Sequence, residues 1–475
     1  MMATKREKLL SLRNLNNNGV DRISCLPLPM IHHVLSFLPI ENVIQTCVLS
    51  KHWRNIWSSI PILNFDAVPY DEWDDFFKFM DTVLLLRDGS DIERLSLTML
   101  EMNDELHEIN MWILHAIRHN VQVLEIDLHM YREDSRYDTD PDTDPDTNSK
   151  LTPRIFNCAS LRKLKLSCNK FLYLPASICL PALRKLQIGN VIINDGQLFE
   201  VLLSATPSLE TLILCSCVFN CSLLTITSAL LKNLDMSGIF PSVVIYAPNL
   251  VSLNLMISHR LPATIRIKDT LLSLIDATIN ISPICYQTAG HIISMVRSAQ
   301  SFSLKSSYLQ FPPFFTALKK DLSILNLIES PFSNLKSLRI QTHYMDAELI
   351  FIHFILKHSP HIESLILAGP LVVSSTIQGE QVEDNKVWSN YDLPNLKFVE
   401  IQGFKGSENE VKLVKFFFEN ASVLEKLIIT IAKCEDPSLA HKYNQEIMKM
   451  GRNILTYSRA SSSLGILFAQ NVRMM

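Results

Sequence analysis

Glycine is scarce in this sequence, at 12 of 475 residues, and neither G-x-x-x-x-G-K-S/T nor G-x-G-x-x-G occurs. Without such a run, a loop that cradles phosphate is hard to place. The G-x-S-x-G turn of a serine nucleophile is also absent, and no cysteine has the sequence setting of an activated nucleophile. The sequence therefore predicts a protein that binds and does not catalyse.

Long apolar runs and strong charge are missing as well. Charged residues make up 19% of the chain and hydrophobic residues 47%, which excludes extensive disorder. No stretch approaches the roughly eighteen apolar residues of a membrane span, and residues 1–10 lack the apolar core of a secretory signal. We expect an intracellular protein, in the nucleus, the cytoplasm or both, without membrane contact.

The cysteines and the charge balance narrow the class of partner. The ten cysteines are scattered through apolar segments, which predicts buried, reduced thiols and no structural disulfide. The formal net charge is only -4, from 44 basic and 48 acidic residues, so no electrostatic surface for nucleic acid is expected. We therefore expect recognition of protein.

Three short helices are predicted after a polar, flexible lead-in over residues 1–20. The second helix spans about Glu41 to Leu49, and Ser50 stands where an N-cap begins the third. Apolar residues follow the spacing of one helix face in each: Ile31, Val34, Leu35 and Leu38 before Pro39; Val43, Ile44, Cys47 and Val48; and Trp53, Ile56, Trp57 and Ile60 before Pro61. A unit this small needs a partner to cover its apolar faces.

A repeating pattern, L-x-x-L-x-L-x-x-N/C-x-L, occupies most of the remaining chain. Two copies match it fully with Phe in the last place: Leu161, Leu164, Leu166, Asn169 and Phe171; and Leu209, Leu212, Leu214, Cys217 and Phe219. Looser copies are Leu183, Leu186, Ile188; Leu231, Leu234, Met236; Leu250, Leu253, Leu255; Leu335, Leu338, Ile340; Ile362, Leu365, Leu367; Leu396, Val399, Ile401; and Leu424, Leu427, Ile429.

The links between these units predict the fold of the repeat. Helix-like segments occur at Asp195 to Ala205 and at Ala347 to His358, each followed by the next strand. Each unit is therefore predicted to consist of a strand and a helix. One unit cannot bury its apolar face alone, so the units are expected to stack into an irregular solenoid with long loops.

The N-terminal motifs resemble the F-box of plant F-box/leucine-rich-repeat proteins. They are Asp21-Arg22-Ile23-Ser24-Cys25-Leu26-Pro27, Leu35-Ser36-Phe37-Leu38-Pro39 and Val48-Leu49-Ser50-Lys51-His52-Trp53-Arg54-Asn55-Ile56-Trp57. The resemblance implies helical faces that bind a Skp-family adaptor and, through it, a cullin. Leu28 and Pro29 replace the family's usual acidic residue and its neighbour, and His52 replaces an arginine. These departures bear on adaptor affinity more than on the fold.

The last quarter resembles the FBD domain that often ends such plant proteins. Its motifs are Leu393 to Ile401, Gly403-Phe404-Lys405-Gly406, Phe416 to Ala421, Leu424-Glu425-Lys426-Leu427 and Arg459-Ala460-Ser461-Ser462. The role of this domain does not follow from its motif.

Together these observations predict an α/β fold, in which a short three-helix F-box precedes an irregular leucine-rich-repeat solenoid of parallel strands and helices that ends in an FBD domain. The expected boundaries are residues 1–20 for the lead-in, 21–66 for the F-box, 67–390 for the repeats, 391–468 for the FBD domain and 469–475 for a tail. The resemblance implies the substrate-recognition subunit of an SCF-type ubiquitin ligase, with an unknown protein target. An interaction or ligand-sensing protein without ligase role is the alternative. The adaptor-binding candidates are Leu26, Pro27, Ile31, Val34, Leu35, Leu38, Pro39, Val48, Leu49, Trp53 and Trp57.

Structural roles explain the possible metal ligands better than metal binding does, and no cofactor is expected. The acidic loop at residues 138–147 has prolines at 141 and 145 and lacks the glycine and glutamate of a calcium loop. Cys215, Cys217 and Cys221 fall short of four zinc ligands, and buried thiols explain them. His115 and His119 could share a helix face but have no third ligand. His32 and His33 belong to the first predicted F-box helix, where they are expected either to border the adaptor or to form ordinary polar surface.

Overall fold

The computed structural model describes residues 23–70, 72–102, 106–130, 150–168, 171–258, 264–268, 271–281, 296–305, 332–344, 346–373 and 391–470. The chain divides into two compact units, Met1–Leu183 and Arg184–Met475. The lead-in at 1–20, the acidic loop at 138–147, Asn169 of the first full repeat and residues 471–475 of the tail lie outside the described residues.

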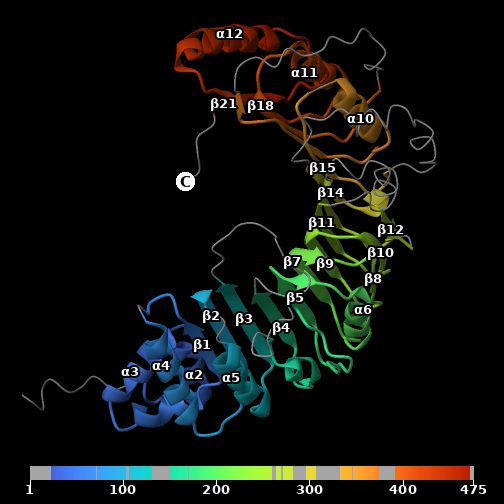
Figure 1. Cartoon of the computed structure of the whole chain (residues 1–475). Coiled ribbons are helices and arrows are strands. Elements are labelled where there is room, and N and C mark those ends of the chain that lie inside the picture. The colour runs from blue at the N-terminus through green and yellow to red at the C-terminus, as the bar shows by residue number, and fades with distance from the viewer. Residues whose placement is uncertain are drawn as a thin grey trace, which may run out of the picture. The chain divides into compact units, whose positions relative to one another are not determined.

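Unit 1 begins with helices and continues with alternating strands and helices (Figure 1). Its elements are α2 (Leu28–Leu35), α3 (Ile40–Gln45), the 3-10 helices η1 (Thr46–Val48) and η2 (Trp53–Ser59), β1 (Ile62–Asp66), α4 (Trp73–Leu85), β2 (Arg94–Met102), α5 (Leu106–Arg118), β3 (Val123–Met130), η4 (Pro153–Asn157) and β4 (Lys163–Cys168). The four strands pair in parallel in the order of the chain.

Unit 2 also contains a parallel sheet. Its main strands are β5 (Lys185–Gly189), β7 (Thr211–Phe219), β9 (Asn233–Ile239), β11 (Ser252–Ser258), β13 (Asp276–Ile281), β14 (Ser301–Lys305), β15 (Ser337–Gln341), β16 (Ser364–Ala368), β18 (Phe398–Phe404), β19 (Lys426–Ile431) and β21 (Gly465–Gln470). They pair in this order, and the short β6 (Ile192–Ile193) joins β7.

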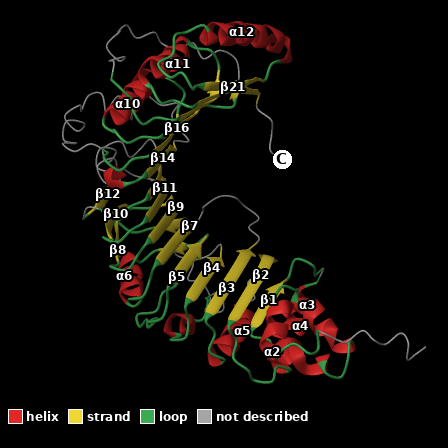
Figure 2. Cartoon of the chain, turned by 180° about the vertical axis from the view of Figure 1, so that it is seen from behind, coloured by secondary structure: helices red, strands yellow, loops and turns green. Residues whose placement is uncertain are grey.

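The elements between these strands lie on one face of the sheet (Figure 2). They are α6 (Gly196–Ser204), η6 (Val296–Ser298), α10 (Asp346–Lys357), α11 (Glu408–Asn420) and α12 (Pro437–Leu455), a small parallel sheet of β8 (Leu223–Thr227), β10 (Ser242–Tyr246) and β12 (Ile265–Ile267), and the pair β17 (Val372–Val373) and β20 (Lys433–Cys434). The α/β solenoid fold predicted from the sequence is confirmed.

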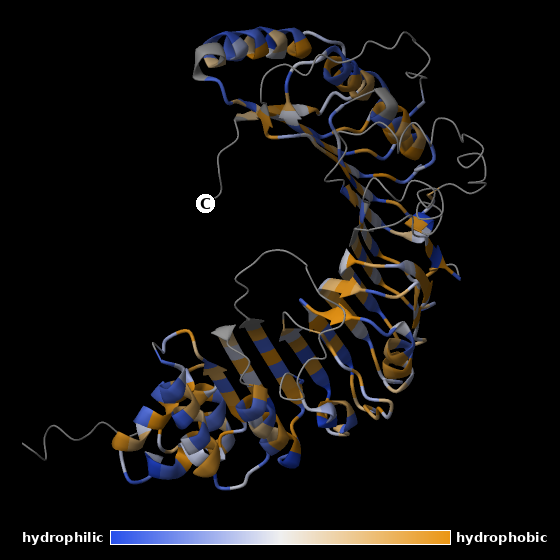
Figure 3. Ribbon diagram, in the orientation of Figure 1, coloured by the Kyte–Doolittle hydropathy of each residue, from blue (hydrophilic) through white to orange (hydrophobic). Residues whose placement is uncertain are grey.

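The repeat pattern determines which strand residues enter the core. Side chains alternate between the two faces of a strand, so the second and third leucine positions point the same way. In all nine predicted repeats the three leading apolar residues are at most 2% exposed. Along the strands, apolar and polar bands alternate accordingly (Figure 3).

Five further repeats have the same spacing but fewer leucines, and the sequence pattern did not reveal them. Their buried residues are Ile60, Leu63, Phe65; Ile92, Leu95, Leu97; Val121, Leu124, Ile126; Leu274, Ala277, Ile279; and Ala299, Phe302, Leu304. Any apolar side chain of suitable volume fills these positions, because burial and not leucine itself is required.

Asparagines at the turns join neighbouring repeats. The side-chain nitrogens of Asn249 and Asn395 donate to the backbone carbonyls of Ala229 and Pro360, at 2.9 and 2.8 Å. Asn334 makes the same kind of bond to Ser298 at 3.3 Å. Each bond satisfies a carbonyl at the turn of the preceding repeat, which otherwise would depend on water.

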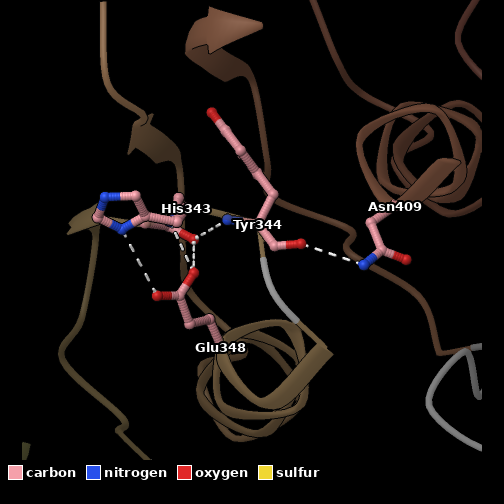
Figure 4. A network of polar contacts seen from close by, with 5 residues as sticks. His343, Tyr344, Glu348 and Asn409 are labelled. Atoms are coloured by element: carbon pink, nitrogen blue, oxygen red, sulfur yellow. Dashed lines mark hydrogen bonds and ion pairs between the residues drawn. The ribbon is translucent and has the colours of Figure 1, made fainter. Parts of the chain in front are cut away.

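The repeats of β15 and β18, which are separated by the repeat of β16, share a left-handed turn between strand and helix. Tyr344 before α10 and Gly406 before α11 have φ angles of 62° and 80°. Two residues into each helix stands a glutamate that is 1% exposed, Glu348 or Glu410. Glu348 accepts hydrogen bonds from Thr342 Oγ1 and the His343 backbone nitrogen, both at 2.7 Å (Figure 4). Glu410 accepts from backbone nitrogens of the equivalent turn, including Ser407 at 2.7 Å. These carboxylates therefore hold the turns in place.

Most predicted helices are present, and the third helix of the F-box differs. Segments predicted from Asp195 and Ala347 form α6 and α10, and Asp195 caps α6 by accepting from the backbone of Gln197 and Leu198. The third F-box segment is the 3-10 helix η2, and its N-cap is His52 and not the predicted Ser50. No side chain caps it.

Candidate functional site

Helix α2 of the F-box has two apolar faces. Ile31 and Leu35, one turn apart, are 1% and 3% exposed and belong to the core of unit 1. Met30 and Val34, also one turn apart, are 54% and 50% exposed. Residues four apart lie on the same side of a helix, so one face packs inward and the neighbouring face is open to solvent.

The exposed face continues beyond the end of α2. Phe37, seven residues after Met30, is 76% exposed, and its ring contacts that of His33 edge-on with the centroids 5.1 Å apart. Leu38 follows at 39% exposed, and Val48 and Leu49 at the end of η1 are 82% and 64% exposed. We call Met30, Val34, Phe37, Leu38, Val48 and Leu49 the outer residues of the F-box. So many large apolar side chains in contact with water indicate a surface that binds another protein.

The inner residues form a core of the F-box itself. Trp53 is 6% exposed, and its indole nitrogen donates a hydrogen bond to the hydroxyl of Ser24 at 2.7 Å. Ile56 of the same short helix is also buried, as are Ile40 and Val43 of α3. This core fixes the position of α2, and with it the outer residues.

The structure divides the eleven adaptor-binding candidates into three groups. Ile31, Leu35 and Trp53 are buried, which places them in the core and not at a surface. Leu26 and Trp57 are half-buried. The remaining six are exposed: Pro27, Val34, Leu38, Pro39, Val48 and Leu49.

Two of the most suitable surface residues were missed from the sequence. Met30 and Phe37 were not among the candidates, although both are more exposed than Val34. Their signal is a second apolar spacing, Met30, Val34 and Phe37 at i, i+4 and i+7, which overlaps that of the buried face.

The residues at the start of α2 leave this helix without a side-chain cap. Pro27 is the N-cap, a proline stands in the first turn, no side chain accepts a hydrogen bond from the first turn, and no acidic residue lies there. His32 is half-buried beside the Ser59 hydroxyl at 3.2 Å, and burial lowers its pKa. His33 is exposed, as the sequence predicts.

Hydrogen bonds hold the F-box on the first strand and helix that follow it. The guanidinium of Arg87, after α4, donates to the carbonyl of Ile60 at 2.6 Å. The hydroxyl of Tyr70 donates to the carboxylate of Glu41 in α3 at 3.0 Å. Burial and this bond raise the pKa of Tyr70 to about 12. The F-box therefore shares a continuous structure with the first repeats of unit 1.

Outward-facing strand residues of unit 1 carry paired charges. Lys163 of β4 forms an ion pair with Glu125 of β3, and Lys165 pairs with Asp127 at 2.5 Å. In each pair the acidic residue stands two positions beyond the direct cross-strand partner of the lysine, so both ion pairs are diagonal. Such pairs of opposite charge on neighbouring strands stabilise the sheet.

The side chains considered as metal ligands contact backbone carbonyls or pack against each other. Cys217 is buried and its thiol contacts the carbonyl of Ile188 at 3.4 Å, while the Cys221 thiol contacts that of Leu223 at 3.4 Å. The rings of His115 and His119 are tilted against each other with centroids 4.5 Å apart, and burial lowers the pKa of His115. Within the described ranges, no three histidine, cysteine or acidic residues are grouped to hold a metal ion. No helix in the described part of the chain is long and apolar enough to cross a membrane.

Comparison with known proteins identifies the parts of the chain. The F-box domain model matches residues 23–65, the FBD model residues 393–429, and the model "FBD-associated F-box protein At5g56370, LRR repeats" residues 109–271. These three matches define an F-box protein with leucine-rich repeats and an FBD domain. The exact domain boundaries given above remain predictions.

Two plant relatives match the chain over nearly its whole length. The F-box/LRR-repeat protein At3g58930 of Arabidopsis thaliana is 26% identical over 481 residues, covering 92% of this chain and 96% of the relative. The F-box/FBD/LRR-repeat protein At5g22660 of the same plant is 26% identical, covering 95% and 97%. The chain therefore carries an F-box, leucine-rich repeats and an FBD domain, as such plant proteins do, and the resemblance seen in the sequence is confirmed.

Proposed function

We propose that this protein is the substrate-recognition subunit of an SCF-type (Skp-cullin-F-box) E3 ubiquitin ligase. The F-box docks a Skp-family adaptor, which connects it to cullin, and the repeats bind a target protein. The observation that carries the proposal is the set of outer residues, with Phe37 at 76% and Val48 at 82% exposed. F-box domains typically bind Skp-family adaptors, and these outer residues provide an apolar surface for that contact.

The chain contributes binding and not catalysis in this proposal. It holds the target near a charged conjugating enzyme recruited elsewhere in the complex. The effective concentration of target lysines near that enzyme then rises without any new chemical group. Such a subunit works inside the cell, in the nucleus, the cytoplasm or both.

Adaptor binding distinguishes this proposal from an interaction or ligand-sensing role. The full chain is co-expressed with a plant Skp adaptor and cullin and then purified. A Val34→Asp, Phe37→Asp variant removes two outer residues, and a Leu272→Asp variant places the same charge on a side chain that is 78% exposed in unit 2. Substitution of Leu35 or Trp53 is unsuitable, because both belong to the core.

Wild type and Leu272→Asp are expected to retain adaptor and cullin, and the double variant is expected to lose both. If no adaptor co-purifies with folded wild type, the ligase proposal fails and the interaction or sensing role takes its place. If the double variant binds as wild type does, the outer residues are not the docking surface.

A further inference from the structure

The open face of the sheet in unit 2 changes from polar to apolar at strand β16. Side chains on this face alternate with the buried ones, and the helices of the unit lie on the opposite face (Figure 2). One row of register partners runs across the open face from β11 to β19: Asn254, Thr278, Ser303, Arg339, Ile366, Glu400 and Ile428. Its members are polar or charged as far as Arg339, whereas Ile366 and Ile428 are apolar and stand on either side of Glu400.

Apolar side chains surround Glu400 on three sides. Ile366 and Ile428 are its direct partners on the two neighbouring strands. Phe398 stands two residues before Glu400, on the same face of β18. All four residues are half-buried. Strands β16, β18 and β19 each pair with another strand along both edges, so this arrangement does not depend on where the chain ends.

The carboxylate of Glu400 is held in place, and no basic side chain among the described residues forms an ion pair with it. Its Oε1 accepts a hydrogen bond from Gln402 Nε2 at 2.7 Å, and Gln402 Oε1 lies 3.5 Å from the guanidinium of Arg339. Lys426, the exposed register partner of Phe398, is also on this face but does not contact the carboxylate. A negative charge that apolar neighbours shield from water is stabilised when a cation approaches it.

We propose that Glu400 with Ile366, Phe398 and Ile428, called the Glu400 site below, binds an arginine or lysine side chain that apolar residues flank in a target protein. This inference rests on the proposed function, in which the repeats hold a target. The stems of arginine and lysine pack on apolar surface while their charged ends reach a carboxylate. Because Gln402 binds Oε1, the other oxygen, Oε2, is left for the incoming cation. An acidic or wholly apolar segment would cover Glu400 without pairing its charge, which is unfavourable.

The probe is a displayed library of random peptides, selected on the purified full chain without adaptor. All proteins carry the double substitution of the outer residues given above, so that peptides that bind the F-box are not selected. Glu400→Lys reverses the charge of the site, and Asp276→Lys is the matched control. Asp276 is an exposed carboxylate on the same open face, but its register partners are Ser252 and Ser301 and not apolar residues. Circular dichroism verifies that every variant is folded.

Peptides selected on the parent protein are expected to carry an arginine or lysine between apolar residues. Their affinity, measured by fluorescence anisotropy, should fall at least about 10-fold with Glu400→Lys and stay unchanged with Asp276→Lys. Glu400→Gln, which keeps the shape of the side chain, should also weaken binding. A peptide in which glutamate replaces the basic residue should bind Glu400→Lys more tightly than it binds the parent. This reversal distinguishes a contact between charges from a loss of structure.

Selection of no peptide, or only of peptides without a basic residue, overturns the proposal. A basic peptide that binds Glu400→Lys as tightly as it binds the parent also overturns it, since the contact then lies elsewhere. If the parent has the molar mass of two chains and Glu400→Lys that of one, the site binds a second copy and the proposal fails as well. Adaptor binding by the wild-type chain is measured separately. Its absence alone contradicts the ligase role, whereas a failed peptide selection contradicts only the Glu400 site.

Discussion

The phenol of Tyr344 donates a hydrogen bond to the backbone carbonyl of Gln402 at 2.7 Å. Tyr344 follows β15, and Gln402 belongs to β18, two strands further along the sheet. The bond crosses the intervening repeat, where the same hydroxyl lies 3.2 Å from the carbonyl of Leu367. The side-chain nitrogen of Asn409 in turn donates to the backbone carbonyl of Tyr344 at 3.1 Å (Figure 4). Tyr344 thus connects the repeats to the FBD domain.

Tyr344→Phe is expected to lower the free energy of unfolding by about 1 kcal/mol, the usual net worth of one hydrogen bond. The loss stays small because the Gln402 carbonyl keeps its bond from the Gly369 backbone nitrogen at 2.9 Å. Urea denaturation of the full chain measures the change. An unchanged midpoint would show that the phenol does not stabilise this junction.

The glycine at position 403 gives a prediction with a matched control. Gly403 has a φ of 69°, and a β-carbon added there would lie 2.4 Å from the carbonyl oxygen of Pro370. Gly89 has a φ of 83° with nothing within 4 Å of the same position. Gly89→Ala should cost about 1 to 2 kcal/mol from backbone strain alone, and Gly403→Ala clearly more. Equal midpoints in urea would contradict the close packing at Gly403.

Acidic pH should destabilise the folded protein because His353 must be protonated. This ring is 6% exposed and hydrogen bonded to the Tyr391 hydroxyl at 2.8 Å, and burial lowers its pKa to about 4 from 6.5. The unfolded chain takes up the proton first as pH falls. The stability from the neutral ring is therefore complete above pH 6.5 and is lost progressively as pH falls through 6.5 towards 4.

The loss over this window is expected to reach about 3 kcal/mol. His353→Phe keeps the aromatic contact with Phe416 and removes the titration. Unfolding free energies at neutral pH and near pH 4.5 should therefore differ by less in the variant than in wild type. An identical difference in both proteins would show that His353 does not titrate in this way.

Substitution of a core residue and of a surface residue of the F-box should change its stability by very different amounts. Trp53→Ala should cost about 3 to 5 kcal/mol, because it empties a buried volume and removes the bond to Ser24. Phe37→Ala should change stability by less than about 0.5 kcal/mol, as expected for a surface residue. Thermal melts of the two variants measure this. Similar losses for both would place Phe37 in the core.

The strand positions of the solenoid could be predicted because burial requires an apolar residue at a fixed spacing. Leu209, Leu212 and Leu214 show the pattern plainly. The repeat at Ala299, Phe302 and Leu304 has the same geometry with different side chains, so a pattern based on leucine does not detect it. In such a repeat the spacing of the three buried residues is kept although the residue types differ.

The candidate surface could be predicted only in part. Helix α2 is apolar on two neighbouring faces, and periodicity does not show which one packs inward. Leu35 and Val34 are adjacent in the sequence and both apolar, yet one is 3% and the other 50% exposed. Their difference depends on the packing of α2 within unit 1, against residues that lie far from α2 in the sequence.

The most direct test of the proposed function is the affinity of a purified plant Skp adaptor for the full chain, measured by calorimetry. We expect wild type and Leu272→Asp to bind with equal affinity, and Val34→Asp with Phe37→Asp to bind at least about 100-fold more weakly. Thermal stability should be the same in all three proteins. If wild type gives no binding, or if the double variant binds as tightly as wild type, the adaptor does not dock on the outer residues of this F-box.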